Sequence, residues 1–387
     1  TTSTPKNVVY TVVPVGVNGC LGNPFTVTAT IDPEPVVAVQ TKTVCSDAPL
    51  GVNFNSSTSV AAATYNITAI NLNGLTASAG SPATGTGLAV NVIANDAFTN
   101  TTNAPVDVIY TVVPVSAAGC QGNPFTVTAT INPEPVVANH GKTVCSDAPL
   151  AVTFNPSTSI AAAAYNVTAL TLNGLTVSAG GATVANGLTA TALADDAFTN
   201  TTNAPVNVVY TVVPVSADGC LGNPFTFTAT INPEPVVADQ TLTSCSDAPL
   251  NASFNSSSSV AAATYNITAI NLNGLTVSAG GATAANGLAA NAIADDAFTN
   301  TTNAPVNVIY TVVPVSAAGC LGNPFTVTVT VNPEPVVANQ TRTVCSDEAV
   351  GISFGNDTNG PSAVSYNVTS LVLNNLTVSA GGTILSN

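Results

Sequence analysis

The cysteines of this chain recur at a fixed interval. A short interval, as from Cys20 to Cys45, alternates with a longer one, as from Cys45 to Cys120, and the remaining cysteines continue the pattern at Cys145, Cys220, Cys245, Cys320 and Cys345. The words YTVVPV, GNPFT and PEPVVA repeat around them with a period of 100 residues. A unit of this size can fold alone, whereas solenoid repeats of roughly 20–50 residues depend on their neighbours. The period therefore predicts a tandem array of domains.

Proline-rich segments mark the joints between the units. Each PEPVVA word places two prolines almost side by side, which cannot continue a β-ladder and which hold the chain extended. We therefore place boundaries near Pro35, Pro135, Pro235 and Pro335. The expected domains are a partial repeat at 1–35 (the last two strands), complete repeats at 36–135, 136–235 and 236–335, and a partial repeat at 336–387 (the first strands).

Every local pattern within a unit indicates a β-strand. FTVTATI alternates apolar and threonine residues, which predicts Phe125, Val127, Ala129 and Ile131 on the inner face. VIYTVVPV is apolar on both faces and predicts a central strand that ends at an edge or bulge at Pro114. In the copy from 136, VVANHGKTV, LAVTFN, AAYNVTALTL, LTVSAG and GLTATALA are further candidates. Seven strands in a unit of this length predict an all-β sandwich.

The order of these words resembles a known class of repeats. A cysteine precedes the second strand in VCSDAP, and another lies in the final hairpin turn before GNPFT. This arrangement resembles the PKD-like and immunoglobulin-like repeats of secreted Bacteroidetes surface proteins, and it covers essentially the whole chain. The commonest PKD signature has a Trp or an aromatic pattern in the third strand. This chain departs from that signature and has only a tyrosine there, at Tyr65, Tyr165, Tyr265 and Tyr366. The resemblance implies tandem seven-stranded β-sandwiches in a linear rod, as in the stalks of large adhesins or surface filaments.

The regular cysteines predict disulfides and an oxidising, extracellular compartment, because no close pair such as CxxC suggests zinc. Three pairings are possible. Bridges inside each copy would join Cys45 to Cys120 and its equivalents, and bridges between copies would join Cys45 to Cys220 and Cys145 to Cys320. Bridges across the short interval, as between Cys20 and Cys45, would require the joint to form a hairpin.

Sandwich geometry bears on this choice. The turn after the first strand is expected at the pole near the next domain, and the final hairpin turn at the pole near the previous one. A strand of about six residues separates these poles by about 20 Å, whereas a disulfide needs Cα atoms within roughly 7 Å. Geometry therefore opposes the bridge within a copy, but the sequence leaves the within-copy and between-copy pairings as open alternatives.

Composition excludes several classes of function. The formal net charge is −15, with four Lys or Arg residues, so neither nucleic acid nor an anionic membrane surface is an expected partner. Since 45% of the residues are hydrophobic and 6% are charged, the chain can bury a core. The sequence contains no apolar run of about 18 residues, so we expect no membrane-spanning helix. The chain opens without Met, and we interpret it as a processed chain or a segment of a longer one.

The sequence offers little for catalysis, and we expect neither an enzyme nor a cofactor or metal. His140 is the only histidine, and its equivalents are Gln40, Gln240 and Gln340. Paired carboxylates in ADDAF, at Asp195 with Asp196, are reduced to Asp96 in the first copy. Asp47 and its copies are expected to cap a turn, and one or two carboxylates per joint are few for Ca²⁺.

The N-x-S/T pattern recurs and includes Asn100, Asn200 and Asn300. If the source glycosylates, the outward residues of the third strand are the best candidates, namely Asn66, Asn166, Asn266 and Asn367. The leading hypothesis is a structural stalk of a cell-surface adhesin or an extracellular fibre, whose partners are neighbouring repeats or copies of the chain. The alternatives are a module whose loops bind glycans or proteins, and spacers attached to a secreted enzyme.

Overall fold

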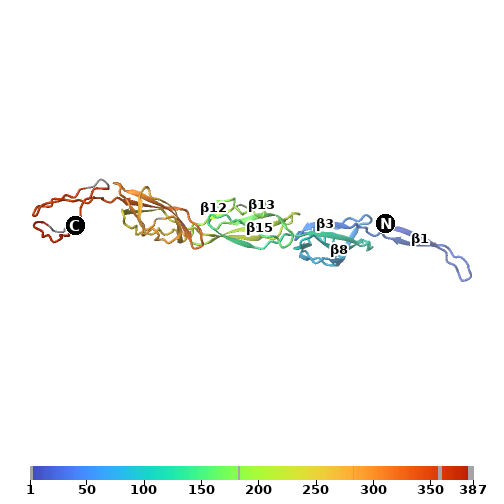
Figure 1. The fold of residues 1–387 in the computed structure, drawn as a ribbon. Helices are drawn as coiled ribbons and strands as arrows, with labels where there is room; N and C mark the ends of the chain where they lie inside the picture. Colours follow the sequence, from blue (N-terminus) through green and yellow to red (C-terminus); the bar gives the residue numbers. More distant parts are fainter. Residues whose placement is uncertain (1–2, 182–183, 282, 356–359, 382–387) are drawn as a thin grey trace.

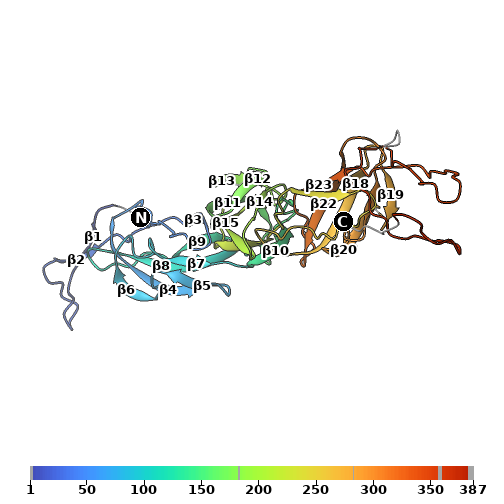
Figure 2. The same cartoon turned by 90° about the vertical axis from the view of Figure 1, so that its left-hand side faces the viewer.

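The chain forms a rod of β-domains in this computed structural model, which describes residues 3–181, 184–281, 283–355 and 360–381. Figure 1 shows the repeats following one another along the long axis in sequence order, and Figure 2 shows the same order from a second side. The described residues contain strands, turns and bends but no helix. The expected all-β fold in tandem units is therefore confirmed.

Each complete repeat contains seven strands at equivalent positions. In repeat 36–135 these are β3 (Gln40–Cys45), β4 (Ala62–Asn71), β5 (Thr76–Ala79), β6 (Gly85–Leu88), β7 (Ala97–Thr99), β8 (Val106–Ser116) and β9 (Phe125–Asn132). In repeat 136–235 they are β10 (His140–Cys145), β11 (Ala162–Thr171), β12 (Thr176–Ala179), β13 (Ala185–Leu188), β14 (Ala197–Thr199), β15 (Val206–Ser216) and β16 (Phe225–Asn232). In repeat 236–335 they are β17 (Gln240–Cys245), β18 (Ala262–Asn271), β19 (Thr276–Ala279), β20 (Ala285–Leu288), β21 (Ala297–Thr299), β22 (Val306–Ser316) and β23 (Phe325–Asn332).

The strands of a repeat form a five-stranded and a two-stranded sheet. In the first complete repeat the larger sheet has the order β3-β9-β8-β4-β6, and β5 pairs with β7. The first strand lies parallel to the last one, with Gln40 opposite Val127 and Cys45 opposite Asn132. The other pairs are antiparallel. Because β3 and β9 run in the same direction, both carry the chain from one pole of the sandwich to the other.

The core follows the alternation read from the sequence. Phe125, Val127, Ala129 and Ile131 are at most 3% exposed, and the residues between them are half-buried. They pack with Tyr110 and with other side chains of β4 and β8 in one cluster per repeat. Phe98 is also fully buried.

Three expectations about strands were wrong. LAVTFN is not a strand, although Leu150, Val152 and Phe154 are buried alternately. Its amides bond irregularly to the segment 190–196, as from Leu150 N to the Asp196 carbonyl (2.8 Å), and Ala151 has a positive φ of 43°. GLTATALA forms a strand only at its start, and the rest is a run of turns.

The third concerns Pro114, where the strand was expected to end. Strand β8 instead continues through this residue to Ser116. The ladder between β8 and β9 stops at Val112 opposite Phe125, and the Pro114 carbonyl accepts from Gly122 N on that side (2.9 Å). The nitrogen of Pro114, which has no hydrogen to donate, faces the same side as its carbonyl. This position lies beyond the last residue pair of the ladder, so the proline removes no hydrogen bond between β8 and β9.

At the beginning of the chain, β1 (Lys6–Val12) and β2 (Phe25–Ile31) form a two-stranded hairpin. Its apolar side chains correspond to core residues of the complete repeats but are exposed here, as with Tyr10 at 56% and Phe25 at 50%. Residues 336–355 and 360–381 contain no strand.

Candidate functional site: the joint between repeats

The joint between complete repeats is a buried Pro-Glu-Pro segment that both neighbours hold. Pro133, Glu134 and Pro135 follow β9 and are all buried. The Glu134 N–H donates to the Asn100 carbonyl of the preceding repeat (3.1 Å). Its carbonyl accepts from the Ser159 hydroxyl of the following repeat (2.5 Å). One residue of the joint is therefore fixed by hydrogen bonds to both repeats, which restricts bending at this point.

Asn100 organises the end of the preceding repeat. It is fully buried, and its Nδ2 donates to the carbonyls of Ile131 (2.7 Å) and Ala104 (3.1 Å). Its Oδ1 accepts from both the N–H and the hydroxyl of Thr102, and its N–H donates to Ser46 Oγ. Every hydrogen-bonding group of the side chain is satisfied, as a buried amide requires. Sequence reasoning missed this role, because Asn100 was considered only as part of an N-x-S/T pattern.

A disulfide crosses each joint between complete repeats. Cys45 is bonded to Cys220, and Cys145 to Cys320, each with a Cα–Cα distance of 5.3 Å and a sequence separation of 175. Of the pairings left open by the sequence, the structure thus contains the one between copies. The bridges within a copy and those across the short interval are absent from the described residues. Cys20, Cys120, Cys245 and Cys345 are free thiols.

The hairpin turn of the following repeat presents the second cysteine of each bridge. Cys220 lies in the turn between β15 and β16, where its N–H donates to Ser216 Oγ (3.1 Å) and its carbonyl accepts from Ser216 N (2.9 Å). The turn packs directly on the joint, since a Cβ added to Gly222 would overlap the Pro135 carbonyl oxygen. Any larger residue there would push the turn away from the joint.

Two carboxyl groups meet beside each bridge. Burial, followed by the charge of Asp47, raises the pKa of Glu134 to about 7. Burial alone would raise the pKa of Asp47 as well. Hydrogen bonds from the side chains of Thr99, Ser78, Glu134 and Ser46 together outweigh burial and hold the pKa of Asp47 below its ordinary value. The Thr99 hydroxyl donates to Asp47 Oδ1 (2.6 Å). Across the next joint, Asp147 and Glu234 repeat the arrangement.

Protonation of Glu134 lets this buried carboxyl group lie beside the exposed Asp47 carboxylate. At pH values below about 7, Glu134 carries the proton and donates to the Asp47 carboxylate. From the next repeat, Asn223 Nδ2 approaches Glu134 Oε1 at 3.5 Å. Asp47 was expected to cap a turn through backbone bonds; the structure instead shows a side-chain partner, Thr99, and a positive φ of 61°. Within the residues that the structure describes, no three or more His, Cys, Asp and Glu side chains lie together as a metal site would need.

The other candidates from the sequence lie apart from the joint. Asp195 is exposed while Asp196 is buried, and burial, with a smaller contribution from the charge of Asp195, raises the pKa of Asp196. Asp196 Oδ2 accepts from the Tyr210 hydroxyl (2.7 Å) inside the core, and Asp96 does the same with Tyr110. These aspartates connect the segment before β7 and β14 to the central strand of the large sheet.

His140 packs within the hydrophobic part of its repeat. Its ring stacks on Phe225 with centroids 5.7 Å apart and lies 5.2 Å from Phe227. In the other complete repeats the equivalent Gln40 and Gln240 instead donate to the carbonyls of Asn53 and Ser253. The contacts of His140 are those of a packing residue.

The four asparagines proposed for glycosylation differ in exposure. Asn66, Asn166 and Asn266 are half-buried in β4, β11 and β18, and Oδ1 of each accepts a backbone N–H, from Gly87, Gly187 and Gly287. Asn367 is exposed and lies outside any strand. Glycosylation at these positions stays a prediction. The fully buried Asn100, Asn200 and Asn300 offer no room for a sugar in the folded state.

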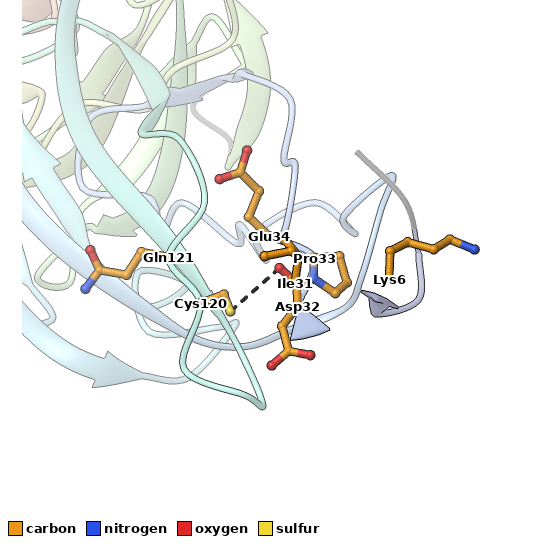
Figure 3. Close-up of a pocket in the computed structure, with 7 residues that line it drawn as sticks. All are labelled: Lys6, Ile31, Asp32, Pro33, Glu34, Cys120 and Gln121. Atoms are coloured by element: carbon orange, nitrogen blue, oxygen red, sulfur yellow. Dashed lines mark hydrogen bonds between the residues drawn. The ribbon is translucent and has the colours of Figure 1, made fainter. Parts of the chain in front are cut away.

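The first joint contains an open hollow of about 330 Å³. Figure 3 shows it between the segment Ile31–Glu34 and the turn that carries Cys120 and Gln121, with Lys6 at its border. The Cys120 thiol faces the Asp32 carbonyl at 4.0 Å. At the next joint, the end of β3 occupies the corresponding place, where Ser46 N donates to the Asn132 carbonyl. The hollow thus belongs to the joint and is lined by its backbone and turn residues.

Comparison with known families agrees with this architecture. The model of the PKD-like domain matches four times, at residues 1–35, 42–135, 142–235 and 242–335. The chain belongs to the PKD-like domain family. The four matches follow the repeat period, and three of them cover most of one complete repeat each. No curated protein matches the chain.

Several solved structures also match the chain at low identity. Drosophila N-cadherin EC1-4 is 13% identical, with 85% of this chain and 84% of that one covered and a TM-score of 0.20. The FN1-FN3 domains of chicken CNTN1 are 11% identical, covering 77% and 99%, with a TM-score of 0.24. Bacteroides ovatus SGBP-B, solved with a mixed-linkage heptasaccharide, is 16% identical, covering 90% and 76%, with a TM-score of 0.16. At these identities and TM-scores, the similarity supports no conclusion about function.

Tandem PKD-like repeats joined by disulfides indicate an extracellular structural or binding module. The structure adds one finding about membranes: none of the described residues form a helix that could span a bilayer.

Proposed function

We propose that this PKD-like chain is a structural stalk of a cell-surface adhesin or extracellular fibre, without catalytic activity of its own. The observation that carries the proposal is the joint: a buried Pro-Glu-Pro segment bound by both repeats and crossed by a disulfide. Domains that act independently are joined by flexible linkers, and relative motion is their normal state. A covalent bond and a buried segment in a joint keep successive domains in one orientation.

Repetition supports the same role. The three complete repeats bury equivalent residues, from Tyr110, Tyr210 and Tyr310 in the core to Glu134 and Glu234 in the joints. A stalk gains length by adding units, and each unit needs only its neighbours for a joint. The neighbouring repeats are therefore the partners that matter most for this role.

Immunogold electron microscopy of cells that produce the protein tests the proposal. With antibodies against the folded repeats, we expect label on filaments or projections outside the cell envelope. The purified chain should be a straight rod under oxidising conditions and should bend at the joints after reduction. Label confined to the cell interior, or purified particles that are equally bent with and without the disulfides, would contradict a stalk.

A further inference from the structure

The segments between Cys120 and Cys145 and between Cys220 and Cys245, here called seam segments, span two repeats each. The second one starts in the hairpin turn of repeat 136–235, follows β16 through that repeat and passes the joint at Pro233–Pro235. It then follows β17 through repeat 236–335 and ends at Cys245. Both β16 and β17 are extended strands, and the prolines hold the joint between them extended as well.

Each disulfide joins the end of one seam segment to a cysteine of another repeat along the rod. Cys45 lies at the end of β3 in the first complete repeat, and its sulfur is bonded to Cys220 at the start of the second seam segment. In the same way the first seam segment ends at Cys145, whose partner Cys320 lies in the hairpin turn of the third complete repeat. In repeats 36–135 and 136–235 a covalent path thus leaves at the pole where the next repeat begins, and it bypasses the remaining strands of the repeat.

This path is far shorter than the polypeptide. From Cys45 to Cys245 the backbone passes through two full repeat periods, whereas the path over the disulfide contains only the seam segment from Cys220 to Cys245. Fully extended, the seam segment reaches about 90 Å and the backbone route about 700 Å. Because the seam segment is already mostly extended strand, little slack remains in it.

Two such paths run side by side with an offset of one repeat. In repeat 136–235 the end of the first seam segment, β10, pairs in parallel with the start of the second, β16, from His140 opposite Phe227 to Cys145 opposite Asn232. Tension along the rod would load both strands in the same direction. Strands β11 to β15 of this repeat connect Cys145 to Cys220 and lie outside the path.

We propose that each disulfide and the seam segment that it joins form a tension-bearing covalent path, here called a cable, which makes the rod inextensible when it is pulled at the two ends of that path. Between those ends the strands outside the path carry no load and serve to hold the cable straight. This inference rests on the proposed stalk role for its purpose. The mechanical property itself belongs to the chain, however, and can be measured whether or not the stalk proposal holds.

Single-molecule force spectroscopy on the full chain provides the test. Handles are attached through azide-bearing residues at Thr43 and Thr243, which are exposed at equivalent places in β3 and β17. The free thiols are first blocked by alkylation. With the bridge intact, the covalent path between the handles runs from Thr43 to Cys45, crosses the disulfide and continues from Cys220 to Thr243. We expect no unfolding step and a total extension between handles below about 10 nm.

In a reducing agent the same molecule should show unfolding steps that release about 60 nm in total, since the whole backbone from Thr43 to Thr243 then lies between the handles. The matched control is the double variant C145S/C320S, which leaves the loaded bridge in place and should extend no further than the unaltered chain. Unfolding steps in the oxidised chain that exceed the expected limit, or identical traces with and without the Cys45–Cys220 bridge, would overturn the proposal. If the purified chain proved inextensible but immunogold labelling found it only inside the cell, that result would contradict the stalk role and leave the cable proposal standing.

Discussion

The joints at 133–135 and 333–335 have the same Pro-Glu-Pro sequence and different environments. All three residues are buried in the first, whereas Pro333 and Glu334 are half-buried and Pro335 is exposed in the second. The bond from the preceding repeat exists in both, from Glu134 N to Asn100 O (3.1 Å) and from Glu334 N to Asn300 O (3.4 Å). The difference arises on the other side. A seven-stranded repeat follows the first joint, and residues 336–355 and 360–381 without strands follow the second.

The properties of a joint therefore come from the next repeat and not from the proline segment itself. The pKa of Glu334 is raised by burial and by Asp247, but only that of Glu134 and Glu234 reaches about 7. Likewise Cys45 and Cys145 are bonded across their joints, while Cys245 and Cys345 are exposed thiols. The covered joint is thus assembled by two folded neighbours.

Removing a disulfide should have the largest effect on the difference between the covered joint at 133–135 and the open joint at 333–335. In the chain-entropy model, closing so long a loop stabilises by about 5 kcal/mol, so C45S/C220S should lower the free energy of unfolding by up to that amount. Hydrogen exchange measured by mass spectrometry should show faster opening of β3 and β16. The control C245S/C345S removes two free thiols and should leave exchange unchanged. Equal effects of the two variants would mean that the covalent bond does not distinguish the joints.

Rising pH should weaken the covered joints. Because the folded-state pKa of Glu134 lies at about 7, above its ordinary 4.5, its stabilising contribution is complete below pH 4.5 and is lost as the pH rises through about 7. The shift itself corresponds to about 3 kcal/mol, and with screening by nearby water we expect about 1–2 kcal/mol per joint. The lowered pKa of Asp47 acts only below about pH 4, outside this window.

The variant Glu134→Gln tests the source of that dependence. Glutamine imitates the protonated acid, so denaturation series from mildly acidic to mildly alkaline pH should show a flatter profile for the variant than for the unaltered chain. Glu334→Gln is the matched control and should change the profile little, because that joint is open on one side. A profile that Glu134→Gln leaves unaltered would assign the pH dependence to other groups.

Gly222→Ala should open a covered joint by steric force. The new methyl group would overlap the Pro135 carbonyl oxygen, so the hairpin turn must move, at a cost of about 1–3 kcal/mol. Gly22→Ala is the control. Its new methyl group would contact the Pro14 side chain, just as the one at Gly222 contacts Pro214, but it would meet no carbonyl of a joint. Thermal unfolding should therefore show a clear loss for Gly222→Ala and a smaller one for Gly22→Ala. Similar losses would assign the effect to the proline ring instead.

The sequence predicted the parts of this molecule that depend on local pattern. The repeat period, the inward residues of FTVTATI and the position of cysteines at opposite poles all follow from spacing and alternation. The pairing of Cys45 with Cys220 was one of two open alternatives, because it depends on how two domains stack. Only the structure places those sulfur atoms together.

The parts that failed depend on contacts between distant segments. LAVTFN alternates as a strand does, yet Ala151 at positive φ and the irregular bonds to 190–196 exclude it from a ladder. Asn100 was invisible as a structural centre, since its partners Ser46, Ile131 and Glu134 lie in other segments. A signal was present: the same asparagine follows AFT in every complete repeat, although the sequence gives no reason for choosing it over other repeated polar residues.

The smallest predicted effect concerns the hydroxyl groups that the following repeat contributes. Ser159 Oγ donates to the Glu134 carbonyl (2.5 Å), so Ser159→Ala should leave that buried acceptor without this partner at a cost of about 1 kcal/mol. Thr158 Oγ1 donates to the Val136 carbonyl (3.3 Å), and in the next repeat Ser258 makes the same bond to Val236 (3.3 Å). Thr158→Ser is therefore a control that the chain itself supplies, and it should be neutral within about 0.5 kcal/mol. Guanidinium unfolding resolves this difference. If Ser159→Ala were as neutral as Thr158→Ser, the following repeat would hold the joint through packing and the disulfide, and the hydroxyl bonds would only accompany that contact.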